Sequence, residues 1–305
     1  MDLRQIRYFV AACEEGSLSA AAIRLHCTPS GVSQQMSALE ARIGTGLLER
    51  TRRGVTPTAA GWRFYERCLV VLTSVSEAQM ELEDFAAGLT GSVAAGFAPG
   101  LAKAVLPAAL ARYTTEYPRV DIEIGSGTAD ALVAETSGGA LDFYVGQFAR
   151  PQVGLKATPI GRFPVALISG ARRGFKPMEP VRLHDVPPLK LSVPSSTHSL
   201  RPRIEEAVRN GEISVERTIT IASLSAGLDF VAQTDWSSIL PFWIALKELG
   251  NERVTVNPIA EPHLSVELAL IHPAQRPLSR ASRHLYDLFR QELQNCEEEW
   301  QRVTR

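Results

Sequence analysis

Long apolar runs are missing from this chain of 305 residues, although 45% of its residues are hydrophobic. No stretch reaches the roughly 18 consecutive apolar residues of a membrane-spanning helix, so none is expected. The N-terminus also lacks the charged, apolar and small-residue pattern of a signal peptide. We therefore expect a cytoplasmic globular protein with two or three domains of roughly 100–200 residues each.

Cysteine is scarce, and its spacing excludes two common uses. The four cysteines lie far apart and form no C-x-x-C pair: Cys13, Cys27, Cys68 and Cys296. This arrangement argues against a structural zinc site and against a disulfide framework, and it fits reduced thiols. A redox sensor is a disfavoured alternative, because residues 91–295 contain no cysteine.

Motifs of the common catalytic and nucleotide-binding sites are also absent. The sequence contains no G-x-S-x-G, no H-E-x-x-H and no Walker loop. Gly125-Ser126-Gly127 follows a strand-like run, but Asp130 stands where a dinucleotide loop has its third glycine. A tight strand-to-helix turn explains this segment better. We therefore expect no enzymatic activity, no catalytic residues, no bound metal and no cofactor.

An excess of positive charge is missing as well, since the formal net charge is −1. A polybasic coat for nucleic acid is thereby excluded, whereas a small local patch is not. Residues 1–62 hold seven Arg against five acidic residues, and residues 63–90 hold two against five. Any basic surface is therefore confined to the first segment, which includes a group of three arginines: Arg50, Arg52 and Arg53.

Short helices joined by tight turns are predicted at the N-terminus. Apolar residues recur at helical spacing in residues 2–14, and Gly16 ends that helix. Ser17 or Ser19 can cap a second helix that ends near Leu25. With the helix that follows, this is the pattern of a helix-turn-helix.

The third helix, residues 28–43, has one apolar and one uncharged polar face. Thr28 can cap it, and Pro29 suits its first position. The apolar face repeats at spacings of four, three and four: Val32, Met36, Leu39 and Ile43. The other face carries uncharged hydrogen-bonding side chains, and no Lys or Arg occurs before Arg42: Ser33, Gln34, Gln35 and Ser37. A helix that simply faces solvent is the alternative interpretation.

A hairpin and a long helix are predicted next. Gly54 and Pro57 mark turns within residues 47–58, which can form a small hairpin, or wing. Residues 58–88 contain no proline and read as one helix. Its apolar residues alternate four and three apart, as in a coiled-coil seam: Phe64, Cys68, Val71, Val75, Ala78, Leu82 and Phe85. The alternative is a helix that packs against its own domain.

The remaining residues change in character. Strand-like runs such as VDIEIG, LDFYVG and VELALI alternate with helical stretches at 101–116, 128–137 and 201–210. Residues 278–303 read as a last helix. This alternation predicts an α/β architecture with largely parallel sheets.

The first 65 residues resemble a LysR-type transcriptional regulator. Several short motifs occur in the family's order: Ala-Ala before Leu25, Ser33-x-Gln35, Leu39-Glu40, Gly44-x-x-Leu47-Leu48-x-Arg50 and Thr56-x-Thr58-x-x-Gly61. The resemblance extends toward the C-terminus, where VLPAALARYTTEYPRVDIEI, GALDFYVG and SSILP are similar to the family's effector domain.

The resemblance implies an α+β multidomain fold. It has a winged helix-turn-helix, a long coiled-coil linker helix and a two-lobed α/β effector domain like type II periplasmic solute-binding proteins. The expected bounds are 1–58, 59–90 and 91–305, with lobe I at 91–161 and 268–305 and lobe II at 162–267. A solute-binding protein itself is disfavoured, since residues 1–88 would have no role in it.

Within the family frame, the third helix would read DNA in the major groove. Gln34 can pair with adenine, and Ser33 can donate or accept. The wing arginines suit phosphates, which position the protein without reading sequence. The expected DNA contacts are Ser17, Thr28, Pro29, Ser33, Gln34, Arg50, Arg52 and Arg53. For the arginines, a solvated surface charge is the alternative.

The seam of the long helix predicts a dimer and an interrupted inverted-repeat operator in double-stranded DNA. The expected dimer contacts are Phe64, Val71, Val75, Ala78, Leu82 and Phe85. The resemblance implies a homotetramer, built as a dimer of dimers.

The resemblance also implies a small-molecule effector between the lobes, at the carboxyl ends of the strands. Three loops are expected to hold it: Ala98, Pro99 and Gly100; Gly127 and Thr128; and Ser195, Ser196, Thr197, Ser199 and Arg201. Hydroxyls and N–H groups at a helix start suit a carboxylate, so a small organic or aromatic acid is predicted. A polar surface turn at 194–202 is the alternative.

Overall fold

The computed structural model describes residues 1–305 except 52–53, 88, 148–151, 196–197 and 199, and it does not describe the side chains of 76–77 and 79–87. The chain forms two compact units. The first unit comprises Met1–Gly88, Pro151–Lys156 and His272–Ser279. The second comprises Leu89–Arg150, Ala157–Ile271 and Arg280–Arg305. Within the described residues, no helix is both long enough and apolar enough to cross a membrane.

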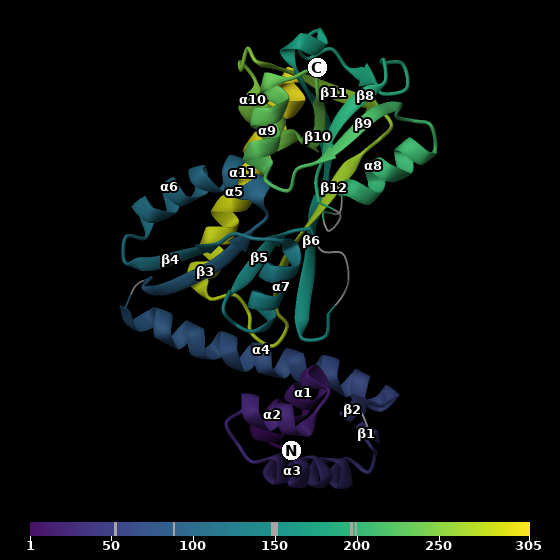
Figure 1. Ribbon diagram of the computed structural model, residues 1–305. Coiled ribbons are helices and arrows are strands. Elements are labelled where there is room, and N and C mark those ends of the chain that lie inside the picture. The colour runs from purple at the N-terminus through teal and green to yellow at the C-terminus, as the bar shows by residue number, and fades with distance from the viewer. Residues whose placement is uncertain (52–53, 88, 148–151, 196–197, 199) are drawn as a thin grey trace. The chain divides into compact units, whose positions relative to one another are not determined.

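The first unit is a small helical head with a hairpin and a long helix. Its elements are α1 (Leu3–Glu15), α2 (Leu18–Arg24), α3 (Pro29–Ile43), β1 (Leu48–Thr51), β2 (Gly54–Pro57) and α4 (Ala59–Ala87). In this head α1 lies between α3 and α4 (Figure 1). Strands β1 and β2 pair antiparallel and form the predicted wing. The apolar face of α3 is buried as predicted through Leu39, whereas Ile43 is 41% exposed.

Side chains at the helix ends explain where the helices of the head begin and end. Asp2 caps α1 in a capping box with Gln5. Thr28 Oγ1 accepts a hydrogen bond from the Gly31 amide at 3.2 Å, and so caps α3. Gly16 and Gly44 end α1 and α3 with φ of 61° and 76°, a left-handed conformation that glycine adopts without a steric penalty.

Helix α4 spans nearly the predicted range, but its first half packs on its own domain. Tyr65, Cys68 and Leu72 are at most 6% exposed and belong to the core of the head. Phe64 also contacts this core, since its ring lies 5.1 Å from that of Phe9. Burial within the same domain therefore accounts for Phe64, which was predicted to contact a partner helix.

The second unit is an α/β domain with two lobes. Its first lobe contains β3 (Gly91–Phe97), α5 (Pro99–Ala104), α6 (Leu106–Glu116), β4 (Val120–Gly125), α7 (Ala129–Ser137), β5 (Phe143–Gly146) and the long α11 (Arg280–Val303). The other lobe contains β7 (Val181–Arg182), β8 (Leu189–Val193), α8 (Leu200–Arg209), β9 (Val215–Thr220), α9 (Leu224–Gln233), β10 (Ser237–Pro241), α10 (Phe242–Glu248) and β11 (Val254–Glu261).

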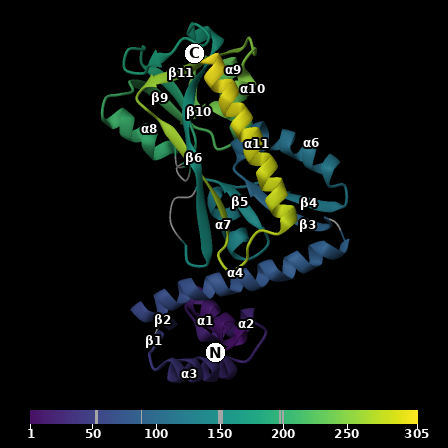
Figure 2. The same cartoon turned by 180° about the vertical axis from the view of Figure 1, so that it is seen from behind.

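Two long strands join the lobes. They are β6 (Leu155–Gly170) and β12 (Ser265–Pro273), and the predicted lobe boundaries after residues 161 and 267 lie within them. The sheet runs in the order β4-β3-β5-β12-β6-β10-β8-β9. Pairs β3–β4, β3–β5, β8–β9 and β8–β10 are parallel, whereas β6 and β12 pair antiparallel with their neighbours β10 and β5. Figures 1 and 2 show both crossover strands running from one lobe to the other.

Candidate functional site

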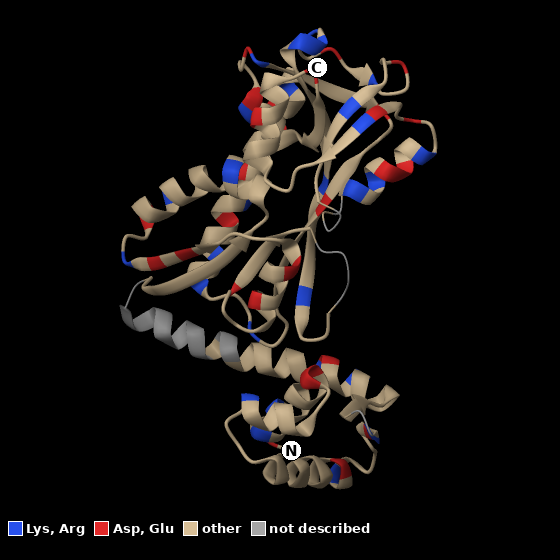
Figure 3. Cartoon of the chain, viewed as in Figure 1, with Lys and Arg blue, Asp and Glu red and all other residues tan. Residues whose placement is uncertain are grey.

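The outer face of α3 presents polar side chains to solvent. Gln34 and Ser37 are exposed, while Ser33 and Gln35 are half-buried. Gln35 accepts a hydrogen bond from Gln5 Nε2 at 3.1 Å, whereas Gln34 has no side-chain hydrogen bond within the described part of the chain. Figure 3 shows charge on α3 only near its C-terminal end. Gln34 can therefore offer both its amide donor and its carbonyl acceptor to a base edge.

The wing is fixed to α3 by Glu40, which was not among the predicted DNA contacts. Glu40 Oε1 accepts hydrogen bonds from the backbone amides of Leu47 and Leu48 at 2.7 and 3.0 Å. Arg50, exposed on β1, donates to Ser33 Oγ at 3.3 Å. Glu40 thus positions the wing, and Arg50 lies beside the predicted reading face. The sequence signal that could have identified Glu40 is its position in the Leu39-Glu40 motif.

The other predicted DNA contacts differ in how they are placed. Thr28 and Pro29 are exposed at the start of α3. Ser17 is half-buried, and its hydroxyl accepts a hydrogen bond from the Ala20 amide at 3.3 Å as the cap of α2. Arg52 and Arg53 lie outside the described residues.

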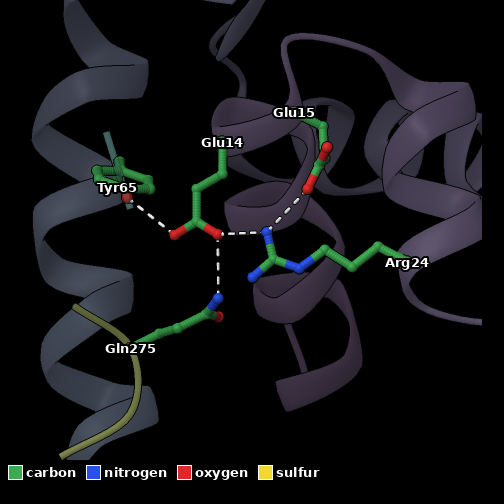
Figure 4. A network of polar contacts seen from close by, with 5 residues as sticks. All are labelled: Glu14, Glu15, Arg24, Tyr65 and Gln275. Carbon is green, nitrogen blue, oxygen red and sulfur yellow. Dashed lines mark hydrogen bonds and ion pairs between the residues drawn. The ribbon is translucent and has the colours of Figure 1, made fainter. Parts of the chain in front are cut away.

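A buried carboxylate organises the head away from α3. Glu14 accepts hydrogen bonds from Arg24 at 2.7 Å, from the Tyr65 hydroxyl at 3.0 Å and from Gln275 Nε2 at 3.0 Å (Figure 4). Its side chain is only 6% exposed. Burial and the neighbouring Glu14 raise the pKa of Tyr65, so the hydroxyl stays protonated and donates. The network joins α1, α2, α4 and the segment 272–279 within the first unit.

Beyond the head core, α4 keeps apolar side chains on its surface. Val70 and Val71 are 58% and 39% exposed. Ala78 is also exposed, and Val75 is half-buried. The side chains of two more predicted dimer contacts lie outside the described ones: Leu82 and Phe85. The described part of the predicted seam is thus largely available to a partner from Val71 onward.

A cavity of about 110 Å³ lies in the second unit and is lined by residues of both lobes. From the first lobe come the start of α5 and Gln147, and from the other come the ends of β8 and β10 with the starts of α8, α9 and α10. Most of the lining is apolar: Ala98, Pro99, Leu101, Val193, Pro194, Leu200, Ile221, Ala222, Leu224, Leu228, Leu240, Pro241, Trp243, Ile244 and Leu268. Gly100 and Gly227 also line it.

The described polar side chains of the pocket are few, and most are already engaged. They are Gln147, Ser192, His198, Ser223 and Ser238. The Ser238 hydroxyl donates to the Ser192 carbonyl at 3.0 Å, and Ser223 caps α9. The His198 ring accepts a hydrogen bond at Nδ1 from the Leu200 amide at 3.3 Å, and burial lowers the pKa of His198.

One donor beside the pocket is buried without a partner. Trp243 Nε1–H has no hydrogen-bond acceptor within the described part of the chain. A Cβ added at Gly100 would lie 3.1 Å from this nitrogen, so glycine allows the start of α5 to pack closely against the indole. An unpaired buried donor costs roughly 1–3 kcal/mol, which an acceptor from a ligand can recover.

The structure brings together only some of the predicted effector contacts. Ala98, Pro99 and Gly100 line the pocket as predicted. Several others are not among the described lining residues: Gly127, Thr128, Ser195 and Arg201. The Thr128 hydroxyl caps α7, because it accepts a hydrogen bond from the Ala131 amide at 3.3 Å. Ser196, Thr197 and Ser199 lie outside the described residues.

The two units match two models of one family. The model described as "Bacterial regulatory helix-turn-helix protein, lysR family" matches residues 3–62. The model described as "LysR substrate binding domain" matches residues 86–294. The two matches follow each other along the chain in the order predicted from the sequence.

Two similar proteins that match this chain over most of their length are named as regulators. The nitrogen assimilation regulatory protein nac of Klebsiella aerogenes is 30% identical over 280 residues, which are 92% of this chain and 91% of that protein. A probable hydrogen peroxide-inducible genes activator of Streptomyces viridosporus is 28% identical over 270 residues, covering 88% and 86%. Full-length CbnR, solved with its target DNA, has a similar fold with a TM-score of 0.57 at 23% identity, covering 96% of this chain and 99% of that one.

Proposed function

The chain belongs to the LysR family of bacterial helix-turn-helix regulators, and from this premise we propose which surfaces read its operator and bind its effector. It is a DNA-binding transcriptional regulator with a C-terminal effector-binding domain. The named relatives are regulators rather than enzymes. We infer that it acts in the cytoplasm, where its DNA lies.

The free polar face of α3 carries the proposal for DNA reading. Gln34 reads adenine, and Ser33 and Thr28 contact neighbouring base edges or phosphates. Arg50, with Arg52 and Arg53, binds phosphates and so positions α3 without reading sequence. The side chain of Gln34 supports this assignment, because it is exposed and makes no hydrogen bond within the described residues.

Operator binding by single variants tests this assignment. An operator is first selected from random DNA with the wild-type protein. Gln34→Ala is expected to cost ~1–3 kcal/mol on that operator and little on random DNA. Gln35→Ala is the matched control, since Gln35 is half-buried and bonded to Gln5 rather than free. Equal losses for Gln34→Ala on both DNAs would reject its role as a base reader.

Arg53→Ala tests the phosphate contacts separately. We expect weaker binding to operator and random DNA alike, with a salt slope reduced by about one phosphate contact. A loss confined to the operator would show that Arg53 reads sequence instead.

Two reading helices on one DNA duplex require a dimer, and α4 is the element that supplies it. Its exposed Val71 and Ala78 support a contact with the α4 of a second chain. Two-fold symmetry then gives an interrupted inverted repeat as the operator. A dimer of dimers is the assembly we propose.

The pocket between the lobes is the effector site. Its lining comes from both lobes, so a bound ligand stabilises one arrangement of the lobes over others. The ligand contacts that we propose include Ala98, Pro99 and Gly100 from the start of α5. Because coupling is reciprocal, operator DNA and effector change each other's affinity by the same factor.

A further inference from the structure

The effector pocket carries no charge among its described lining residues. None of them is Lys, Arg, Asp or Glu. A carboxylate that enters such a cavity loses its hydration and gains no opposite charge, which is strongly unfavourable. The predicted organic acid would therefore need either a cation from elsewhere or several free neutral donors.

Arg201 was the cation expected for this purpose, and its guanidinium is already engaged. It donates to Glu205 at 2.6 Å, to the Pro194 carbonyl at 2.9 Å and to Thr220 at 3.1 Å. The ion pair with Glu205 lies along α8, four residues apart. Arg201 therefore supports the segment that leads into α8 and does not line the pocket.

The described backbone amides at the start of α8 also offer little to an anion. The Leu200 amide donates to His198 Nδ1 at 3.3 Å, and the Arg201 amide donates to the His198 carbonyl at 3.0 Å. The His198 amide is bonded to the Ser195 carbonyl at 3.0 Å. These backbone donors, which attract anions at other helix starts, are satisfied within the chain.

The pocket offers two neutral side-chain donors to the polar part of a ligand. Because Nδ1 of His198 accepts a hydrogen bond, a neutral ring carries its proton on Nε2 and donates from there. No hydrogen bond from Nε2 exists within the described residues. The Trp243 indole N–H is the second donor, buried and unpaired. Both can serve a carbonyl or ether oxygen without any charge on the ligand.

We propose that the effector is a neutral, mainly apolar small molecule whose carbonyl or ether oxygen accepts a hydrogen bond from His198. This inference rests on the proposed function of the pocket. The apolar side chains of the lining, among them Leu228 and Leu268, take the body of the ligand, and the cavity of about 110 Å³ suits a small molecule such as one with a single ring.

Pairs of probes that differ only in charge test the proposal on the full-length protein. The pairs are benzamide with benzoate and hexanamide with hexanoate, measured near neutral pH by thermal shift and saturation-transfer NMR. We expect each amide to bind at least ~10-fold more tightly than its acid, because only the acid leaves a buried charge unpaired. Acids that bind as tightly as their amides, or more tightly, overturn the proposal. If no probe of either class binds, both this proposal and the assignment of the pocket as the effector site fail, while the proposed DNA reading by α3 is unaffected.

His198→Asn tests the hydrogen bond itself. Asn retains an acceptor for the Leu200 amide but loses the donor at Nε2. Benzamide affinity should fall ~5–10-fold, as for one lost hydrogen bond, while toluene, which has no acceptor, binds unchanged. Wild-type benzamide affinity in this variant would overturn the assignment of His198.

A second variant guards against misfolding of the first. Leu240→Lys adds an amine to a half-buried lining position, and it should reverse the preference so that benzoate binds more tightly than benzamide. An unchanged preference would show that the probes bind outside this pocket, which also overturns the proposal.

Discussion

Glu14→Ala is expected to be the most disruptive single change in the head outside its apolar core. The side chain is 6% exposed and accepts from Arg24, Tyr65 and Gln275. Alanine leaves the hydroxyl of Tyr65 without its acceptor, and Tyr65 is itself 6% exposed. An unsatisfied buried donor costs roughly 1–3 kcal/mol, whereas Arg24 is 36% exposed and can be rehydrated. Together with the lost packing, we expect a loss of about 3 kcal/mol.

Glu15 provides the matched control, since it is the next residue and binds the same arginine. Its carboxylate lies 3.1 Å from Arg24 Nη1, but its side chain is 34% exposed. An exposed ion pair contributes little, so Glu15→Ala should cost less than about 0.5 kcal/mol. Comparing the two variants therefore separates the effect of burying the carboxylate from the effect of its charge.

Hydrogen exchange in α1 and α2 is the appropriate measurement. Because the chain has two units, a single melting temperature does not report the stability of the head alone. Amide exchange gives the free energy of local opening for these helices directly. Equal effects of the two substitutions, or a loss below ~1 kcal/mol for Glu14→Ala, would refute the reasoning.

Three further predictions concern other parts of the chain. Val71→Lys should dissociate the dimer in sedimentation experiments. Val70 is exposed but lies outside the predicted seam, so Val70→Lys should leave the dimer intact. Dissociation by both variants would reject the seam. Gly170→Ala should destabilise the second unit by roughly 3 kcal/mol or more, because the added Cβ would clash with the Thr234 carbonyl oxygen. Gly227→Ala is the control in calorimetry, since its Cβ would have no neighbour nearer than 3.8 Å. Burial raises the pKa of Cys13 and of Cys68 to about 12, so both thiols should resist iodoacetamide at pH 8 unless the head unfolds. Since unfolded thiols ionise at lower pH, this contribution to stability is present near neutral pH and is lost as pH rises toward 12.

Local signals in the sequence were sufficient for the head. Thr28, Pro29 and the spacing from Val32 to Leu39 define α3, because a helix cap and an apolar face are properties of neighbouring residues. The structure confirms both the cap and the apolar face of α3. The Glu14–Gln275 bond was beyond such reasoning, since it joins residues 261 positions apart.

The pocket shows the same limit more clearly. The loop at Ala98–Gly100 was found, because it follows the first strand of an α/β unit. Trp243 and Leu268 were missed, because they reach the pocket through the order of strands in the sheet rather than through any local pattern. The hydroxyl residues within 194–202 led to the prediction of an anion site at the start of α8. The described backbone amides there donate to groups of the chain itself instead.

Helix α4 explains why a periodic pattern alone cannot identify a partner. Tyr65, Cys68 and Leu72 face the core of their own head, while Val70 and Val71 are exposed. A helix that is apolar on two sides packs against a different element on each side. Each of these faces gives apolar residues spaced three and four apart. The seam read from the sequence therefore combined two faces: Phe64 and Cys68 belong to the head, and the exposed surface from Val71 onward is the part that we expect a second chain to cover.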